Sequence, residues 1–383
     1  MNVCDANTHA KCIGCGACTT VCPLDLLHIN LDNAGFYKAS INDADLCVEC
    51  GKCTDVCPVI NEPEKARVAA FYGFARDSED RKHGTSGGIF TAIAKHYVQN
   101  GGVVFGAVLD LGEGCVYHAS SKEQAVASMS KSKYVQSNTD GVFQKIKLLL
   151  EENKDVLFCG TPCQVSGLLR SLGRKYNNLL TIDFICHGVP SIRLFQDYLL
   201  DLKKKHKDKP VSEYDFRSKA NGWGRIRVSY RVNNKRIYVK GILDPFNHLF
   251  EKGLSVNPAC YECTHRLMHN ADITLGDFWA YKKAGLSKDF VRDGVSLYVA
   301  NTEKGTEKLK SLPCLQLSQM DIKLSDYAFA SRKKSSEECI RFHEDYKSNG
   351  YAFVKRKYAS KLLMKSIRAK IKSVIALCSS HRR

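Results

Sequence analysis

Two hydrophobic patterns alternate through the middle of the chain. Short apolar runs rich in β-forming residues come between stretches in which apolar residues recur at helical spacing. From residue 67 onward these segments fall at residues 68–74, 88–98, 103–108, 142–150, 156–158, 165–172, 179–185 and 192–202. Alternation of strand and helix is typical of an α/β fold, so we predict an α/β body with a mostly parallel or mixed sheet over residues 66–330.

The pattern changes towards the C-terminus. Residues 225–239 are typical of a β-hairpin with Asn233 and Asn234 at its turn, and further strand-like runs follow at 273–275 and 295–300. We expect a helical basic tail over residues 331–383, because its apolar residues recur at helical spacing between lysines and arginines. These apolar residues are Leu362, Leu363, Ile367, Ile371, Val374 and Ile375.

The net charge of +17 is concentrated in this tail. Residues 346–383 hold eleven Lys or Arg and no Asp or Glu, so the remainder of the chain is only +6. We therefore expect no nucleic-acid partner for the body. Three interpretations of the tail stay open: a helix packed on its own domain, a helix lying on an anionic membrane surface, or a contact with a partner protein or nucleic acid.

The composition favours an ordinary globular protein of a reducing compartment. The chain is 44% hydrophobic and 25% charged, and its N-terminus shows no basic start followed by an apolar run. Eighteen cysteines in such a chain are more typical of metal ligands and free thiols than of disulfides. We expect a cytoplasmic protein that could also lie peripherally at the inner face of the membrane.

A cysteine pattern occurs twice near the N-terminus. Residues 12–23 read CIGCGACTTVCP and residues 47–58 read CVECGKCTDVCP. This is the spacing of bacterial two-cluster ferredoxins, in which three cysteines of one repeat bind a 4Fe-4S cluster with the last cysteine of the other. Structural zinc and disulfide scaffolds rarely use such triplets. We predict a ferredoxin module over residues 1–60 with ligand sets Cys12, Cys15, Cys18, Cys57 and Cys47, Cys50, Cys53, Cys22.

A second group of cysteines lies in the predicted body. Cys163 and Cys186 each follow a strand where a helix begins, and Cys260 and Cys263 form a C-x2-C pair. These four thiols are enough for a third cluster. There are three alternatives. Cys186 and His187 could form a catalytic pair, Cys260 and Cys263 could hold zinc with His265 or His269, or Cys159 could replace Cys163 as a cluster ligand. Isolated cysteines, interpreted as ordinary thiols, are Cys4, Cys115, Cys314, Cys339 and Cys378.

Several motifs together resemble the beta-subunit family of the coenzyme F-420 hydrogenases and dehydrogenases, over about residues 1–310. They are residues 86–88 (SGG), 132–137 (SKYVQS), 160–164 (GTPCQ), 186–191 (CHGVPS), the Cys260/Cys263 pair and residues 271–279 (ADITLGDFW). The resemblance implies a flavoprotein whose FAD exchanges a hydride with the deazaflavin coenzyme. It also implies that Cys163, Cys186, Cys260 and Cys263 bind a 4Fe-4S cluster in the body.

The residues themselves also suggest a flavin. Clusters pass single electrons whereas most organic substrates take a hydride, so a converter such as FAD is needed between them. Ser86, Gly87 and Gly88 open a predicted helix whose N–H groups could bind the FAD pyrophosphate, although a glycine-containing helix cap explains the same residues. Ser132, Lys133 and Tyr134 could add a cation and hydroxyls to this cofactor site.

We therefore expect an iron–sulfur flavoprotein oxidoreductase. Its expected partners are an external electron donor or acceptor, such as ferredoxin or a redox subunit, and a small-molecule hydride partner. The alternatives are a non-catalytic electron-transfer subunit and a redox enzyme of cell-surface polysaccharide biosynthesis. The sequence assigns no catalytic side chain.

Overall fold

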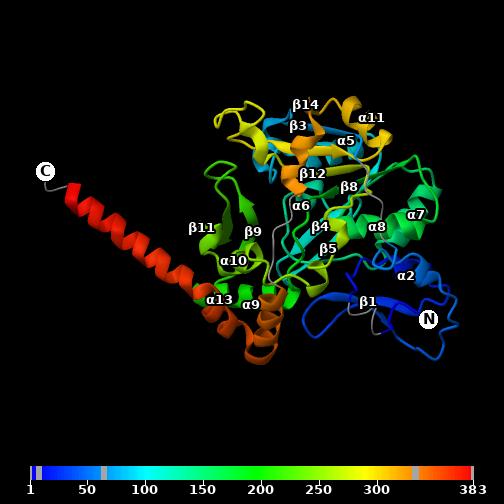
Figure 1. Ribbon diagram of the computed structural model, residues 1–383, viewed down its shortest axis with the longest axis horizontal. Coiled ribbons are helices and arrows are strands. Elements are labelled where there is room, and N and C mark those ends of the chain that lie inside the picture. The colour runs from blue at the N-terminus through cyan, green and yellow to red at the C-terminus, as the bar shows by residue number, and fades with distance from the viewer. Residues whose placement is uncertain (1, 6–10, 62–66, 330–335, 381–383) are drawn as a thin grey trace.

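In the computed structural model the chain forms a small N-terminal module, a large α/β body and a long C-terminal helix (Figure 1). The structure describes residues 2–5, 11–61, 67–329 and 336–380, and for residues 324, 327, 328, 336 and 360–380 it describes the backbone alone. This architecture confirms the predicted fold class.

The two cysteine repeats of the module fold alike. The elements of the module are α2 (Ala17–Val21), β1 (Leu27–Leu31), β2 (Tyr37–Ile41) and α3 (Lys52–Asp55). Strands β1 and β2 pair antiparallel, and α2 and α3 each begin inside a repeat. The equivalent residues Gly16 and Gly51 precede the helices with φ of 84° and 77°, a left-handed conformation that favours glycine.

A nine-stranded mixed sheet forms the centre of the body, in the order β14-β3-β13-β12-β8-β7-β4-β5-β6. Its strands are β3 (Ala69–Ala75), β4 (Val103–Asp110), β5 (Cys115–Ser120), β6 (Ser137–Asn138), β7 (Val156–Cys159), β8 (Leu179–Phe184), β12 (Ile273–Asp277), β13 (Ser296–Ala300) and β14 (Leu315–Met320). Strands β4, β7, β8 and β12 run parallel. Strands β13 and β14 run antiparallel to their neighbours, and β5 is antiparallel to β4 but parallel to β6. The predicted parallel centre is therefore present.

Helices cover both faces of this sheet. They are α4 (Ser78–His83), α5 (Ile89–Gln99), α6 (Val126–Met129), α7 (Val142–Glu151), α8 (Pro162–Leu172), α9 (Ile192–Lys205), α10 (Pro245–Glu251), α11 (Glu303–Ser311) and α12 (Asp326–Phe329). On one face Leu157 and Ile182 are fully buried with Ile93 of α5. On the other face Phe158 and Leu168 of α8 belong to a second buried cluster. Alternate residues of the central strands thus serve two cores, as expected for a sheet buried on both sides.

A smaller three-stranded sheet contains the predicted hairpin. Strands β10 (Arg227–Val232) and β11 (Lys235–Lys240) pair antiparallel around a turn in which Asn233 has φ of 51°. The third strand, β9 (Val211–Ser218), is not predicted by the sequence pattern.

The module is fixed to the body by specific hydrogen bonds. The Gln136 side chain accepts from Tyr37 N at 2.7 Å and donates to the carbonyls of Ile13 at 3.1 Å and Tyr37 at 3.2 Å. At the β1–β2 turn, Ser191 Oγ donates to Ala34 O at 2.7 Å. Gln136 is 2% exposed, so these bonds are shielded from water.

The C-terminal element α13 (Ser336–Ser380) consists of two helices joined at a kink at Gly350, where φ is 72° and ψ is −177°. It begins as part of the body and its end extends away from it (Figure 1). Phe342 and Val354 are fully buried, Tyr346 OH donates to Asp197 at 2.6 Å, and Lys355 pairs with Asp201 at 2.7 Å. The predicted apolar stripe from Leu362 onward lies outside the described side chains. Among the described residues, no helix is both long and apolar enough to cross a membrane.

Candidate metal centres and cofactor-binding edge

The first predicted ligand set surrounds one cavity inside the module, which we call the proximal cavity. Its volume is about 360 Å³, and its cysteines are Cys12, Cys15, Cys18 and Cys57. The remaining lining is mostly apolar, and Ala39 N donates to Cys12 Sγ at 3.4 Å. Burial raises the pKa of the Cys18 and Cys57 thiols and thereby favours their neutral form. A cationic metal cluster would act in the opposite direction and favour the thiolates.

The second predicted set surrounds a separate cavity of about 420 Å³, the distal cavity. Its cysteines are Cys22, Cys47, Cys50 and Cys53. Cys53 is buried, whereas Cys50 is exposed. Each cavity thus takes three cysteines from one repeat and one from the other, as a two-cluster ferredoxin requires.

The four body cysteines also surround a cavity, of about 480 Å³, which we call the third cavity. They are Cys163, Cys186, Cys260 and Cys263. Cys163 lies in the first turn of α8, whose N-terminus is closed by a capping box of Thr161 and Gln164, and Thr161 Oγ1 lies 3.1 Å from Cys163 Sγ. Gly188 N donates to Cys186 Sγ at 3.4 Å.

The alternatives for these cysteines fit the geometry less well. His269 does not line the third cavity, and its Nδ1 lies 2.8 Å from Asp183 Oδ2. His265 lines the cavity together with Cys260 and Cys263, and its Nε2 lies 3.0 Å from Pro58 O. Across the described ranges, no group of three or more His, Cys, Asp or Glu side chains converges as ligands of a single metal ion do. Cysteines around a cavity fit a multi-atom cluster better than zinc.

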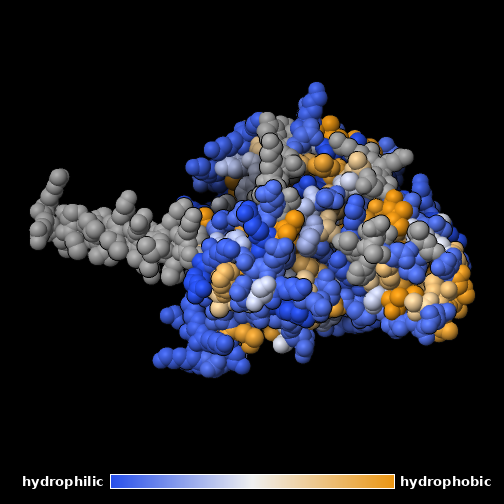
Figure 2. All heavy atoms as spheres, turned by 60° about the horizontal axis from the view of Figure 1, so that its bottom comes forward, coloured by the Kyte–Doolittle hydropathy of each residue, from blue (hydrophilic) through white to orange (hydrophobic). Residues whose placement is uncertain are grey.

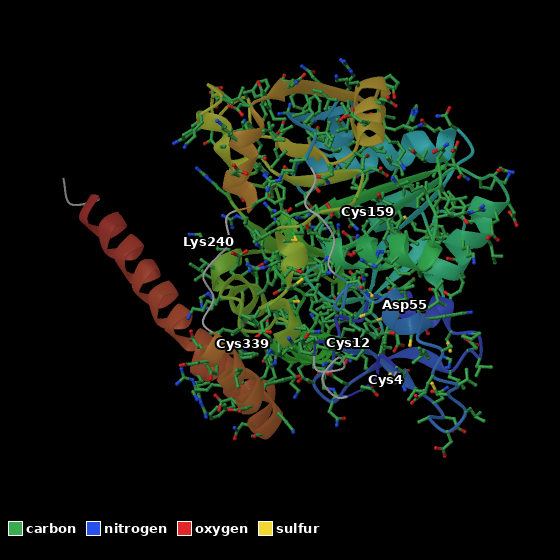
Figure 3. All side chains as sticks on the ribbon, turned by 45° about the vertical axis from the view of Figure 1, so that its right-hand side comes forward. Cys4, Cys12, Asp55, Cys159, Lys240 and Cys339 are labelled. Atoms are coloured by element: carbon green, nitrogen blue, oxygen red, sulfur yellow. The ribbon has the colours of Figure 1, made fainter. Side chains whose placement is uncertain are left out.

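Cys159 lies apart from the third cavity. It is the last residue of β7, its carbonyl oxygen is 3.0 Å from His118 Nε2, and it does not line the cavity. Figure 3 labels it in the body, at a distance from Cys12 in the module. Of these two cysteines, Cys163 is the one that lines the third cavity.

The proximal and third cavities adjoin each other, which the sequence does not show. Ile13 lines both the proximal and the third cavity. A Cβ atom on Gly167 of α8 would lie 3.0 Å from Cys15 Sγ, so the glycine lets a proximal cysteine touch the helix that carries Cys163. His265 adds a contact between the C-x2-C loop and Pro58 beside Cys57.

The residues predicted to bind a flavin come together at the same edge of the sheet as the third cavity. Strand β3 runs parallel to β12 and β8 through the antiparallel strand β13, so the turn at residues 84–88 follows β3 at the edge where Cys186 follows β8. Ser132 N donates to Thr85 Oγ1 at 2.9 Å, which joins the two predicted segments. Carboxyl edges of such sheets are the usual place for ligands.

The N-terminus of α5 fits an anion. Gly88 has φ of 80°, and no side chain caps the helix, so the first N–H groups lack a side-chain acceptor. The polar groups just before this N-terminus already have hydrogen-bond partners in the protein. Ser86 Oγ donates to Val295 O and Gly87 N donates to Ser296 Oγ, both at 2.8 Å.

Two lysines lie beside this turn. Lys133 donates to Ser130 O at 2.5 Å, and burial lowers its pKa to about 7. Lys219, which no sequence pattern indicates, donates to Ser86 O and Asp293 O at 2.7 Å, and burial lowers its pKa to about 7 as well. Tyr134 instead stacks on Phe250, with ring centroids 4.5 Å apart.

Comparison with known proteins yields two family matches. Residues 153–321 match the model for the C terminus of the coenzyme F420 hydrogenase/dehydrogenase beta subunit, and residues 11–61 match the 4Fe-4S dicluster domain. A solved structure of the F420-reducing [NiFe] hydrogenase complex from Methanosarcina barkeri, derivatised with xenon, has a chain that is 15% identical. The match covers 75% of this chain and 94% of that chain with a TM-score of 0.45. No curated protein matches the sequence.

Proposed function

We propose that the protein is an iron–sulfur flavoprotein oxidoreductase. The proposal is supported by the match of residues 153–321 to the C terminus of the coenzyme F420 hydrogenase/dehydrogenase beta subunit and of residues 11–61 to the 4Fe-4S dicluster domain. Each cavity would hold one 4Fe-4S cluster through its four cysteines. Bound clusters would supply one-electron steps, and bound FAD would exchange a hydride with a small molecule such as the deazaflavin coenzyme. An external carrier or partner subunit would supply or remove the electrons.

One observation supports the proposal above all: three cavities are each lined by four cysteines, and the proximal and third cavities share a lining residue. The third cavity lies at the carboxyl edge of the sheet, and Ile13 lines both it and the proximal cavity. The distal cavity lies in the same module, with Cys50 exposed. Electrons would then pass from the distal cluster to the proximal cluster and on to the third cluster and the flavin.

At the sheet edge, Ser86, Gly87 and Gly88 would bind the FAD pyrophosphate through the first turn of α5. Lys219 holds this turn in place through the Ser86 carbonyl. Ser132, Lys133 and Tyr134 form the adjacent wall, where the Lys133 ammonium could neutralise phosphate charge after giving up its contact with Ser130 O.

Metal and flavin analysis tests the proposal. Anaerobically purified protein should contain about twelve irons and one FAD per chain, and Cys186→Ala should remove about four irons while sparing the two module clusters. Cys314→Ala, a half-buried cysteine outside all three cavities, is the matched control. Iron that stays near eight in both wild type and Cys186→Ala would contradict the third cluster.

A non-catalytic electron-transfer subunit is the second candidate. It is favoured by the internal hydrogen bonds of Gly87 N and Lys133, which leave these groups satisfied without a cofactor. About twelve irons with no flavin would select this candidate. A screen of hydride partners, including the deazaflavin coenzyme, separates it from an enzyme.

We also propose peripheral contact with anionic membranes, in a reducing cytoplasm, through the end that carries α13. Arg227 lies opposite Lys240 in the β10–β11 pair, which places two like charges side by side. Arg231 and Arg236 also lie opposite each other, but both pair with Glu213. Tyr238 is 46% exposed nearby, and Figure 3 labels Lys240 on the side away from the module. Such a site would also suit a redox enzyme of cell-surface polysaccharide biosynthesis.

Vesicle binding tests this contact. Deletion of residues 360–383, which spares the packed part of α13, should abolish salt-sensitive binding to anionic vesicles and leave the iron content unchanged. Full-length protein that ignores such vesicles at low salt would contradict the membrane contact.

A further inference from the structure

Apolar side chains are exposed around the distal cavity. Leu24 is 47% exposed, Leu46 60% and Val48 67%, and Leu24 and Val48 line the cavity itself beside Cys50. Figure 2 shows hydrophobic residues gathered at the end of the molecule that carries the module. Exposed apolar groups that adjoin a functional site are typical of protein interfaces.

The same region is acidic in a basic chain. Residues 1–61 hold seven Asp or Glu and three Lys, whereas the whole chain has a net charge of +17. Asp25, Asp43, Asp45 and Glu49 are exposed close in sequence to the distal cysteines, with Lys52 as the one basic residue between positions 42 and 53. A negative rim around an apolar centre complements a positive partner surface.

We propose that this distal face, formed by Leu24, Asp43, Asp45, Leu46 and Val48, docks a one-electron carrier protein whose own surface is basic and partly apolar. The proposal rests on the proposed function, because it needs a cluster in the distal cavity. One electron passes between the reduced carrier and the oxidised cluster, or in the reverse direction, and no bond or proton is exchanged.

The geometry favours a protein over a small mediator. A diffusing small molecule needs only the exposed Cys50, whereas the apolar side chains around that cysteine gain free energy only when a partner surface covers them. The acidic rim would attract a basic carrier and repel an acidic one. This electrostatic interaction weakens as salt shortens the Debye length from about 30 Å at 0.01 M to about 8 Å at 0.15 M.

Binding to cytochrome c, a basic one-electron protein, is the direct test with the full-length, cluster-containing protein. With both proteins oxidised, we expect saturable binding that weakens at least about tenfold between 0.01 and 0.15 M salt. Asp45→Lys should weaken it about tenfold at low salt. Glu307→Lys, the same charge change on exposed α11 at the far side of the body (Figure 1), is the matched control.

The apolar part of the distal face has its own test. Leu46→Gln should weaken binding at every salt concentration and leave the salt dependence unchanged, while Leu200→Gln, a 55% exposed leucine of α9, should have no effect. Equal weakening by the control variants, or equally tight binding of an acidic plant-type ferredoxin, would overturn the proposal. Self-association that Asp45→Lys abolishes would identify a second copy as the occupant and would overturn it too.

Iron content and reduction by a viologen separate failure of the docking face from failure of the proposed function. Protein with about twelve irons that is reduced by viologen but shows no salt-sensitive binding to cytochrome c has the clusters and lacks the docking face. Protein without irons in the distal cavity would refute the proposed function itself and the docking proposal with it.

Discussion

The two cysteine repeats of the module have nearly the same sequence pattern and very different surroundings. The distal cavity includes the exposed Cys50, whereas the repeat that supplies most of the proximal cysteines contacts the body at Cys15 and Gly16. A Cβ atom on Gly16 would lie 2.9 Å from Thr139 Oγ1, while one on the equivalent Gly51 would meet nothing nearer than 3.9 Å. Identical local motifs therefore acquire different roles from the contacts that the rest of the chain adds.

The largest expected difference between the repeats comes from their cysteines. Cys15→Ser and Cys50→Ser should each remove about four irons. Only Cys15→Ser should stop viologen-driven reduction of bound flavin, because the proximal cavity is the one that shares Ile13 with the third cavity. Stopped-flow absorbance measures this reduction. If both variants lose flavin reduction completely, the small mediator cannot bypass the distal cluster.

The hydrogen bonds of Gln136 give the next largest effect. Gln136→Leu should lower the free energy of unfolding by about 3 kcal/mol, because it leaves buried groups of Ile13 and Tyr37 without partners. Gln144→Leu is the matched control, since Gln144 makes one 3.2 Å bond to Thr19 O across the same boundary. Urea unfolding followed by circular dichroism measures both. Equal shifts would mean that Gln136 contributes no more than an ordinary surface contact.

Substitution of the equivalent glycines of the two repeats should have a smaller effect on stability. Gly51→Ala should cost about 1 kcal/mol from its left-handed backbone, as should Gly173→Ala, where φ is 68° and no atom lies within 4 Å of the added Cβ. Gly16→Ala should cost about 2 kcal/mol or more because it also displaces Thr139, which donates to Cys15 O at 2.9 Å. Unfolding midpoints measured by circular dichroism should follow this order. A Gly16 variant as stable as the Gly51 variant would remove the proposed role of Thr139.

The smallest expected difference between the two repeats is in the rate of cysteine alkylation in the metal-free protein. Exposed Cys50 should react with iodoacetamide about tenfold faster than buried Cys18, whose pKa is raised by burial. Mass spectrometry after timed quenching measures the two rates. Equal rates would show that Cys18 is not buried in solution when the metal is absent.

Sequence reasoning predicted the parts of the site that depend on local spacing. The duplicated repeats and the strand-to-helix position of Cys163 are local features, and the structure brings each predicted quartet around one cavity. The fold class followed from alternating patterns in the central strands, which are buried on both faces. Edge strands such as β14 were missed because their side chains are mostly solvent-exposed and carry little apolar signal.

The contacts between module and body could not be predicted in the same way. Gln136 and Tyr37 are separated by 99 positions, and His265 and Pro58 by 207. Such pairs depend on how two folded units meet, and no spacing rule reaches that far. Lys219 was missed for a related reason, because its role appears only when the loop at Asp293 meets the turn at Ser86.

The anchored β1–β2 turn has a consequence for protein engineering. Ser191 donates to Ala34 O, Ile192 N to Gly35 O at 3.0 Å, and Arg193 to Asn33 O at 2.6 Å, so three consecutive residues at the start of α9 hold one turn of the module. In a chimera with another ferredoxin in place of the module, the new ferredoxin would keep its own clusters but would lose these three hydrogen bonds to the start of α9. Transplanted modules should therefore work only when the graft carries a turn of the same length and a surface that fits Gln136.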